Sequence, residues 1–360
     1  MKEDYAIVVG INHYPGMNPL KGAEQDALNF IEWLKDPKGG DVPKEQIFTV
    51  LSSDFEPQPD SPNYARPKIG DIHAKFDDLS DIYIDSTEDP RKIGRRLYLF
   101  FSGHGIGKYQ EGALLMSNAK EPGRLPHFPS SDAAEEITKS AAFEEVILFM
   151  DCCRDDYSKD FVKLNYIFLQ QPKLAEDIKY FRIFASKLGQ KAREAPNPQA
   201  NNRYEGYFTR ALMISLREGV QDNNEINSET LLAALEKNLK NLVPDEAAFN
   251  NFSHRMEPPN QKIFFGEKSV ADKELFAILQ IPLDKFTTIN VVEIKASNNP
   301  IPIKTISTQT DDFTLNADEN VMEISFPLNT GYYKVLLPET NESDLFEVIN
   351  TKTRNYVRIG

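Results

Sequence analysis

Two short segments carry the reactive side chains of this 360-residue chain, and each of them follows an apolar stretch. The first is Phe100-Phe101-Ser102-Gly103-His104-Gly105, and the second is Met150-Asp151-Cys152-Cys153-Arg154-Asp155. A thiol attacks as its thiolate, so it gains from an imidazole that takes its proton and later protonates the leaving amine. The two segments therefore supply a base and a nucleophile for hydrolysis by a cysteine.

Strand geometry decides between the two neighbouring cysteines. Alternate side chains of an extended strand share a face, so a strand that continues through Asp151 points this aspartate and Cys153 one way and Cys152 the other. This favours Cys153 as the nucleophile. His104 follows the predicted strand at 97–101, which should lie next to the strand at 146–150 that precedes Cys153. His104 is therefore the candidate base. The N–H groups of Gly105 and Cys153 are the candidate donors to a developing oxyanion.

The elements that must position these groups alternate between short apolar runs and amphipathic segments, a pattern typical of βα units. The predicted strands are 5–11, 46–51, 97–101, 146–150, 180–185 and 261–265, and the predicted helices are 22–35, 69–84, 207–217 and 228–242 with one more between 101 and 146. Near-continuous apolar strands are buried on both faces. We therefore predict an α/β fold with a mostly parallel sheet flanked by helices.

The last part of the chain has a different pattern. From residue 294 onward, short β-rich pieces are separated by Asn, Asp, Gly and Pro, as in a small sandwich-like all-β domain. We predict a first domain at 1–267, a linker at 268–292 and a small β-rich accessory domain at 293–360.

Composition excludes some classes of function. The net charge of −14 and the pI near 5.0 argue against a nucleic-acid surface, which needs clustered Lys and Arg. No apolar run approaches the roughly 18 residues that span a bilayer, and the first residues lack the pattern of a signal peptide. We expect a cytoplasmic protein that binds neither nucleic acid nor membrane.

The spacing of the two reactive segments is characteristic of a known family. His104 precedes Cys153 by 49 residues, and the caspase pattern places the histidine about 50 residues upstream of the cysteine. The chain resembles the caspase-like cysteine peptidases over roughly residues 5–266, and the metacaspase, paracaspase and bacterial orthocaspase branches more than the animal caspases. The matching segments, in family order, are Tyr5 to Asn12, Leu20 to Ala27, Phe101 to Gly105, Asp151 to Cys153, Phe184 to Ser186, Gly206 to Thr209 and Pro259 to Gln261.

The resemblance implies an activity and a specificity. The family pattern Asp-x-Cys falls on Asp151 and Cys153, which agrees with the alternation argument. In these branches, the aspartates matching Asp151 and Asp26 line the pocket for the residue before the cut and select Arg, then Lys; paired carboxylates suit a guanidinium. Ser186 is implied as a further substrate-binding residue. We expect a cysteine endopeptidase in a regulated pathway such as bacterial defence or cell death.

Some features leave alternatives open. Asp26 is also suited to stabilise a helix N-terminus, and Asp151 to end a strand in a turn. Lys191 and Arg193 follow the strand that ends at Ser186, in a loop expected to edge the substrate groove, where their positive charge would weaken a preference for basic residues. Many metacaspases continue with His-Ser-Gly where this chain has Arg154-Asp155-Asp156, so its branch stays open.

Metal-binding patterns are weak. Asp155, Asp156 and the pair at 77–78 are available to calcium, but no dedicated loop has the spacing of its oxygen ligands. Calcium is therefore a minor option. The histidines outside the reactive segment lack a framework for zinc. We expect no cofactor.

Two other function classes compete with the peptidase. One is a non-catalytic caspase-like scaffold that binds partners through the β-rich domain. The other is a cysteine hydrolase that acts on non-peptide amides. For the peptidase, the expected partners are a protein or peptide substrate and an activator or partner protein bound by the C-terminal domain.

Overall fold

The structure is a computed structural model of the chain. It describes residues 4–85, 92–161, 168–218, 226–243, 252–259, 261–265, 276–282, 288–293, 302–307, 314–316, 321–327, 331–338, 342–348 and 354–358. The chain divides into two compact units. One comprises Met1–Val220 with Glu225–Glu267, and the other comprises Gln221–Asn224 with Lys268–Gly360.

A twisted sheet forms the centre of the first unit, and within the described residues it has six strands in the order β13-β9-β7-β3-β1-β2. Neighbouring strands from β2 to β9 are parallel, and β13 is antiparallel to β9. The bounds are β1 (Asp4–Gly10), β2 (Ile47–Leu51), β3 (Gly94–Gly103), β7 (Phe143–Cys152), β9 (Lys179–Phe184) and β13 (Ser253–Glu257). The predicted α/β class with a mostly parallel sheet is confirmed.

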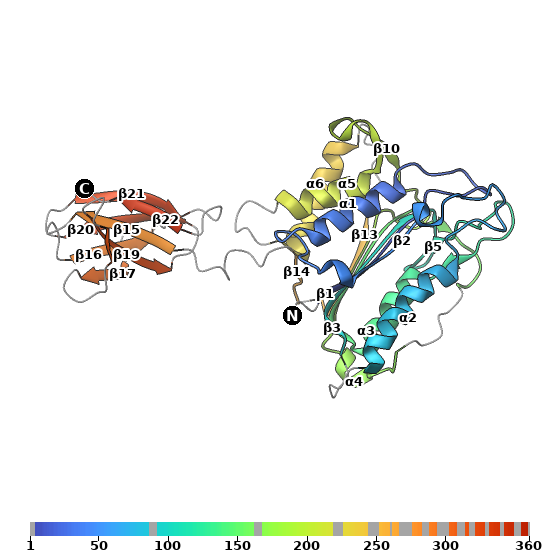
Figure 1. The fold of residues 1–360 in the computed structure, drawn as a ribbon, viewed down its shortest axis with the longest axis horizontal. Helices are drawn as coiled ribbons and strands as arrows, with labels where there is room; N and C mark the ends of the chain where they lie inside the picture. Colours follow the sequence, from blue (N-terminus) through green and yellow to red (C-terminus); the bar gives the residue numbers. More distant parts are fainter. Residues whose placement is uncertain are drawn as a thin grey trace. The chain divides into compact units, whose positions relative to one another are not determined.

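Helices cover both faces of this sheet (Figure 1). The apolar core on one face includes α1, α5 and α6, and the core on the other includes α2 and α3. Successive strand residues alternate between the two cores, as Leu99 and Phe100 do. The helices are α1 (Ala23–Lys35), α2 (Ile69–Asp85), α3 (Ser130–Ser140), the short α4 (Pro172–Ala175), α5 (Tyr207–Glu218) and α6 (Ser228–Leu242), and the 3-10 turns are Lys44–Gln46, Ser52–Phe55 and Pro198–Ala200.

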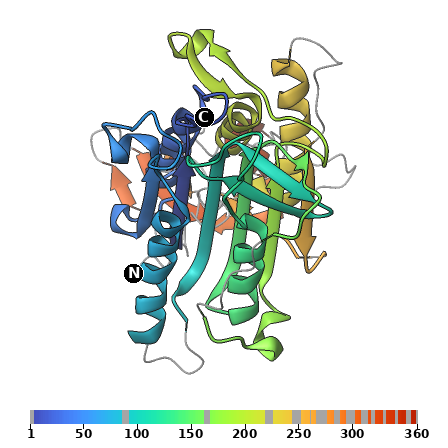
Figure 2. The ribbon, with the colours of Figure 1, turned by 90° about the vertical axis from the view of Figure 1, so that its right-hand side faces the viewer.

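The carboxyl ends of β1, β3 and β7 meet in register, with Ser102 paired to both Gly10 and Asp151. Beyond this edge the chain enters a small second sheet, ordered β6-β5-β4-β8, which lies in front of the strand ends in Figure 2. Its strands and those of a nearby hairpin are β4 (Gly105–Lys108), β5 (Glu111–Leu115), β6 (His127–Phe128), β8 (Asp155–Asp156), β10 (Glu194–Asn197) and β11 (Arg203–Gly206). The residues after both reactive segments are thus held by one sheet.

The end of the first unit differs from the prediction. Of the strand predicted at 261–265, only Phe264–Phe265 is extended; as β14 it pairs with β12 (Ile226–Asn227). The last strand of the large sheet is β13, whose sequence Ser-His-Arg-Met-Glu lacks the apolar run that marks a buried strand. As an edge strand it needs no such run.

The second unit is all β in its described residues, which form two four-stranded sheets ordered β18-β19-β15-β22 and β17-β16-β20-β21. Strand β15 (Phe276–Pro282) lies within the segment predicted as a linker at 268–292, and β16 (Thr288–Glu293) begins in it, so the prediction of a linker was wrong at these residues; 268–275 and 283–287 lie outside the described residues. The other strands are β17 (Pro302–Ser307), β18 (Thr314–Asn316), β19 (Val321–Pro327), β20 (Gly331–Leu337), β21 (Glu342–Val348) and β22 (Arg354–Arg358).

Candidate active site

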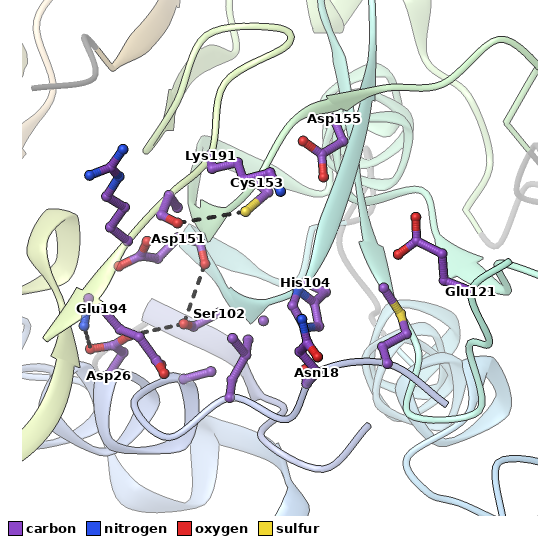
Figure 3. Close-up of a pocket in the computed structure, with 17 residues that line it drawn as sticks. Asn18, Asp26, Ser102, His104, Glu121, Asp151, Cys153, Asp155, Lys191 and Glu194 are labelled. Atoms are coloured by element: carbon purple, nitrogen blue, oxygen red, sulfur yellow. Dashed lines mark hydrogen bonds between the residues drawn. The ribbon is translucent and has the colours of Figure 1, made fainter. Parts of the chain in front are cut away.

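A pocket of about 320 Å³ opens at the carboxyl edge of the large sheet (Figure 3). His104 follows β3, and Cys153 follows β7, the neighbouring strand. Asp26 comes from the first turn of α1, and Asp151 from the end of β7. All four of these predicted residues line the pocket, although their segments are far apart in the sequence.

The two cysteines face opposite ways, as the alternation predicted. Cys152 is 1% exposed within the core, where its thiol lies 3.6 Å from the carbonyl oxygen of Phe101. Cys153 is partly exposed, and its thiol donates to the carbonyl oxygen of Ala192 at 3.7 Å. Burial, with a further effect of the Asp155 charge, raises the pKa of the Cys153 thiol to about 11. A thiol in this environment needs a base to remove its proton.

The imidazole of His104 lies between Asn18 and Cys153 in Figure 3. Its Nε2 is 2.7 Å from the carbonyl oxygen of Asn18. A carbonyl can only accept, so this contact places the proton of a neutral His104 on Nε2 and leaves the Nδ1 lone pair free. The contact thus selects a tautomer in which Nδ1 can receive a proton.

Asp26 and Asp151 form a buried acidic pair in the pocket. Asp26 is 2% exposed and accepts hydrogen bonds from the Gly206 amide at 2.9 Å and the Ser102 hydroxyl at 3.1 Å. One oxygen of Asp151 accepts from both the amide and the hydroxyl of Thr209, at 3.0 and 2.7 Å. Each of these donors is neutral, so the hydrogen bonds orient the two carboxyl groups without balancing their charge.

Burial raises the pKa of both acids. For Asp26 the pKa lies well above its usual value, because burial and the nearby charge of Asp151 both disfavour the ionised form. For Asp151 burial raises the pKa to about 6; the Thr209 hydrogen bonds oppose this rise and the charge of Glu194 adds to it. Binding of a cation would compensate both carboxylates and favour their charged forms.

Glu194 is a further pocket residue, which the sequence patterns do not predict. It begins β10, lines the pocket, and accepts hydrogen bonds from the backbone amides of Lys21 and Gly22 at 3.0 and 2.7 Å. These bonds hold the β10–β11 hairpin against the start of α1, which is more than 170 residues away in the sequence. No local sequence pattern therefore predicts them. Lys191 and Arg193 also line the pocket, as exposed residues.

Two predicted residues, Gly105 and Ser186, lie outside the residues that line this pocket. Gly105 packs so closely on the nucleophile segment that an added Cβ would lie 2.5 Å from the carbonyl oxygen of Cys153. Ser186 is fully buried, and its hydroxyl donates to the carbonyl oxygen of Cys152 at 3.2 Å. Both residues therefore contact the backbone that carries the thiol.

Among the described residues, no group of three or more His, Cys, Asp or Glu side chains is arranged to hold a metal ion. No helix among them combines the length and the apolar character needed to cross a membrane.

Comparison with known proteins shows what the chain is similar to. A probable protease from a Desulfuromonadales bacterium is 30% identical over 228 residues, which cover 60% of this chain and 26% of that protein, so the chain spans about a quarter of its relative. The structure of caspase-1 from Spodoptera frugiperda matches with 14% identity and a TM-score of 0.44, over 71% of this chain and 86% of that one. Pro-sf-caspase-1 matches with 12% identity and a TM-score of 0.36, over 71% and 90%. The family profile described as the caspase domain matches residues 3–250, which is more than half of the chain. The chain therefore belongs to the caspase domain family of cysteine peptidases.

Proposed function

We propose that this protein is a cysteine endopeptidase that cleaves peptide bonds after Arg and, less efficiently, after Lys. One observation carries the proposal: a thiol, an imidazole and a buried acidic pair line a single pocket at the ends of neighbouring strands. The thiol and imidazole supply acyl-transfer chemistry. The acidic pair would bind a basic side chain of the substrate next to the thiol.

The chemistry would use two side chains in sequence. Nδ1 of His104 takes the proton of the Cys153 thiol, and the thiolate attacks the carbonyl carbon of the scissile bond. The N–H groups of Cys153 and Gly105 are the proposed donors to the oxyanion. His104 then protonates the leaving amine, and water hydrolyses the thioester and releases the free thiol.

Specificity would come from the acids of the pocket. A guanidinium presents five N–H donors in a planar fork, which can bind carboxylates in the bidentate geometry that an ammonium lacks, so Arg is preferred to Lys. Asp26 and Asp151 are the proposed partners, with Glu194 as a third acid. Ser186 remains a predicted substrate-binding residue whose buried hydroxyl would act by holding the backbone next to Cys153.

The proposed setting is a regulated proteolytic pathway, such as bacterial defence or cell death. The similarity to a probable protease from a bacterium supports proteolysis in a bacterial cell, and the pathway itself is part of the proposal. The proposed partners are a protein substrate and an activator that binds the β-rich second unit.

Fluorogenic peptides that end in Arg, Lys or Asp test the activity and the specificity together. The purified protein should release the fluorophore from the Arg peptide fastest, from the Lys peptide more slowly, and not from the Asp peptide. Cys153→Ala should abolish this release. Cys152→Ala is the matched control, because it removes the neighbouring thiol from the core and should keep the activity. Absence of turnover of all peptides would contradict the peptidase and support a non-catalytic caspase-like scaffold. Turnover of non-peptide amides alone would support a cysteine hydrolase that does not act on peptides. Cleavage after Asp would refute the proposal that Asp26 and Asp151 bind a basic side chain.

A further inference from the structure

The ring of Tyr14 contacts the imidazole of His104, the proposed base. Tyr14 belongs to the loop after β1 and is fully buried, with its ring centroid 4.7 Å from that of His104 and the two planes at 64°. An edge-to-face pair of this kind limits rotation of the imidazole. Tyr14 does not line the pocket, so it can affect the chemistry only through its neighbours.

The Tyr14 hydroxyl bridges two backbone groups. It accepts a hydrogen bond from the N–H of His104 at 3.1 Å and donates one to the carbonyl oxygen of Leu115 at 3.0 Å. Burial raises the pKa of this hydroxyl well above its usual value, so it keeps the proton that it donates. Gly103 makes the close approach possible, since an added Cβ there would lie 2.6 Å from the Tyr14 oxygen.

The same residue also holds the partner of the imidazole. The carbonyl oxygen of Tyr14 accepts from the Met17 amide at 3.0 Å, which closes a turn directly before Asn18. The carbonyl oxygen of Asn18 is the group that contacts His104 Nε2 at 2.7 Å. Tyr14 therefore connects the backbone of the base, the plane of its ring and the acceptor that selects its tautomer.

From this geometry we infer that Tyr14 is a positioning residue for the base: its hydroxyl fixes His104 and the Asn18 turn relative to each other, so that Nδ1 faces the Cys153 thiol. The inference rests on the proposed function, because it gives His104 the role of base. A small displacement of a catalytic group lowers rates strongly.

Alkylation of Cys153 by iodoacetamide tests this role without any peptide substrate. The rate is measured from pH 6 to 9 by mass spectrometry of the Cys153 peptide, in the full chain. Tyr14→Phe keeps the ring and removes only the hydroxyl. We expect its rate at neutral pH to fall on the order of tenfold towards that of His104→Ala, and its pH profile to shift towards that of an unassisted thiol. An unchanged rate and pH profile would overturn the inference.

Tyr98→Phe is the matched control. Tyr98 is also fully buried, and its hydroxyl accepts a hydrogen bond from Arg96 at 2.8 Å, at the other end of the sheet. Its loss should leave the alkylation rate within about twofold, as expected for sites that share no partners. An equal fall in both variants would overturn the inference, because it would reflect a general loss of structure.

A measurement on the unmodified protein covers the case in which Tyr14→Phe does not fold. Hydrogen exchange resolved to single amides should show the His104 amide protected, since its N–H is bonded to Tyr14. Exchange of this amide at the rate of a free loop would overturn the inference. Neither assay needs peptide cleavage, so failure of the proposed specificity cannot be mistaken for failure of Tyr14.

Discussion

Buried charged side chains have different partners at the two ends of the large sheet. At the amino end, the buried side chains of Arg96 and Glu145 form an ion pair, and Lys179 also contacts Glu145. At the carboxyl end, the hydrogen bonds to Asp26 and Asp151 come from neutral donors, and no ion pair of the described residues involves either acid. The buried charges of one end are paired within the protein, whereas the two buried carboxyl groups of the other end form no ion pair with the described residues.

The consequence is visible in two carboxyl groups of the same strand, β7. Burial alone would raise the pKa of Glu145, but the charges of Arg96 and Lys179 bring it below its usual value. Burial also acts on Asp151, where no cation opposes it, and the pKa rises to about 6. Balanced buried charge serves stability only while both partners are present, whereas unbalanced charge in a pocket marks a functional site. This contrast supports the proposal that the carboxyl end of the sheet binds the substrate.

Removing one charge at the amino end of the sheet should have the largest effect. Glu145→Gln leaves Arg96 buried without its anionic partner, and we expect the free energy of unfolding to fall by about 3–5 kcal/mol in urea titrations. The neighbouring Glu144 is exposed and pairs with Lys92 at 3.0 Å. As the control, Glu144→Gln should cost less than about 1 kcal/mol. Equal losses in the two variants would contradict the contrast between buried and exposed pairs.

Removing one charge at the carboxyl end of the sheet should reduce kcat/KM without lowering the free energy of unfolding. Asp151→Asn keeps an oxygen to accept from Thr209 but loses the charge offered to a guanidinium. We expect kcat/KM for an Arg peptide to fall on the order of 100-fold, with no decrease in the free energy of unfolding. Asp156→Asn, an exposed change outside the pocket, should alter kcat/KM little. A stability loss without a kinetic effect would reverse the assignment of the two ends.

Lowering the pH should reduce the preference for an Arg peptide, by less than the Asp151→Asn substitution does. As the pH falls through about 6, Asp151 takes up a proton, and the preference for an Arg peptide over a neutral-ended peptide should decrease. The ratio of the two kcat/KM values cancels the pH dependence of the chemical step that both peptides share. In Asp151→Asn this dependence should weaken, and an unchanged slope would contradict the role of Asp151.

Protonation of Asp151 should also affect stability. Because its pKa is higher in the folded protein than in the unfolded chain, the folded state binds the proton more tightly. This group therefore favours folding more as the pH falls from above 6 towards the unfolded value near 4. Comparison of the wild type with Asp151→Asn in urea titrations from pH 4 to 7 isolates this contribution.

Local patterns predicted the parallel strands and most of the helices, because buried strands are nearly continuous apolar runs and the helices repeat their apolar residues regularly. The spacing of His104 and Cys153, with strand alternation, predicts that these two side chains lie near each other, and both line the pocket. Glu194 and Tyr14 were not found, because each acts through backbone contacts with residues far away in the sequence. The edge strand β13 was missed because polar residues suffice there.

A pair of peptides that differ only in charge tests the central claim most directly. Citrulline has the shape of arginine with a neutral urea group in place of the guanidinium, so kcat/KM for Arg against citrulline before the cut isolates the charge. We predict that the wild type prefers Arg on the order of 100-fold and that Asp151→Asn loses most of this preference. Equal cleavage of both peptides by the wild type would show that the acidic end of the sheet does not bind the substrate cation.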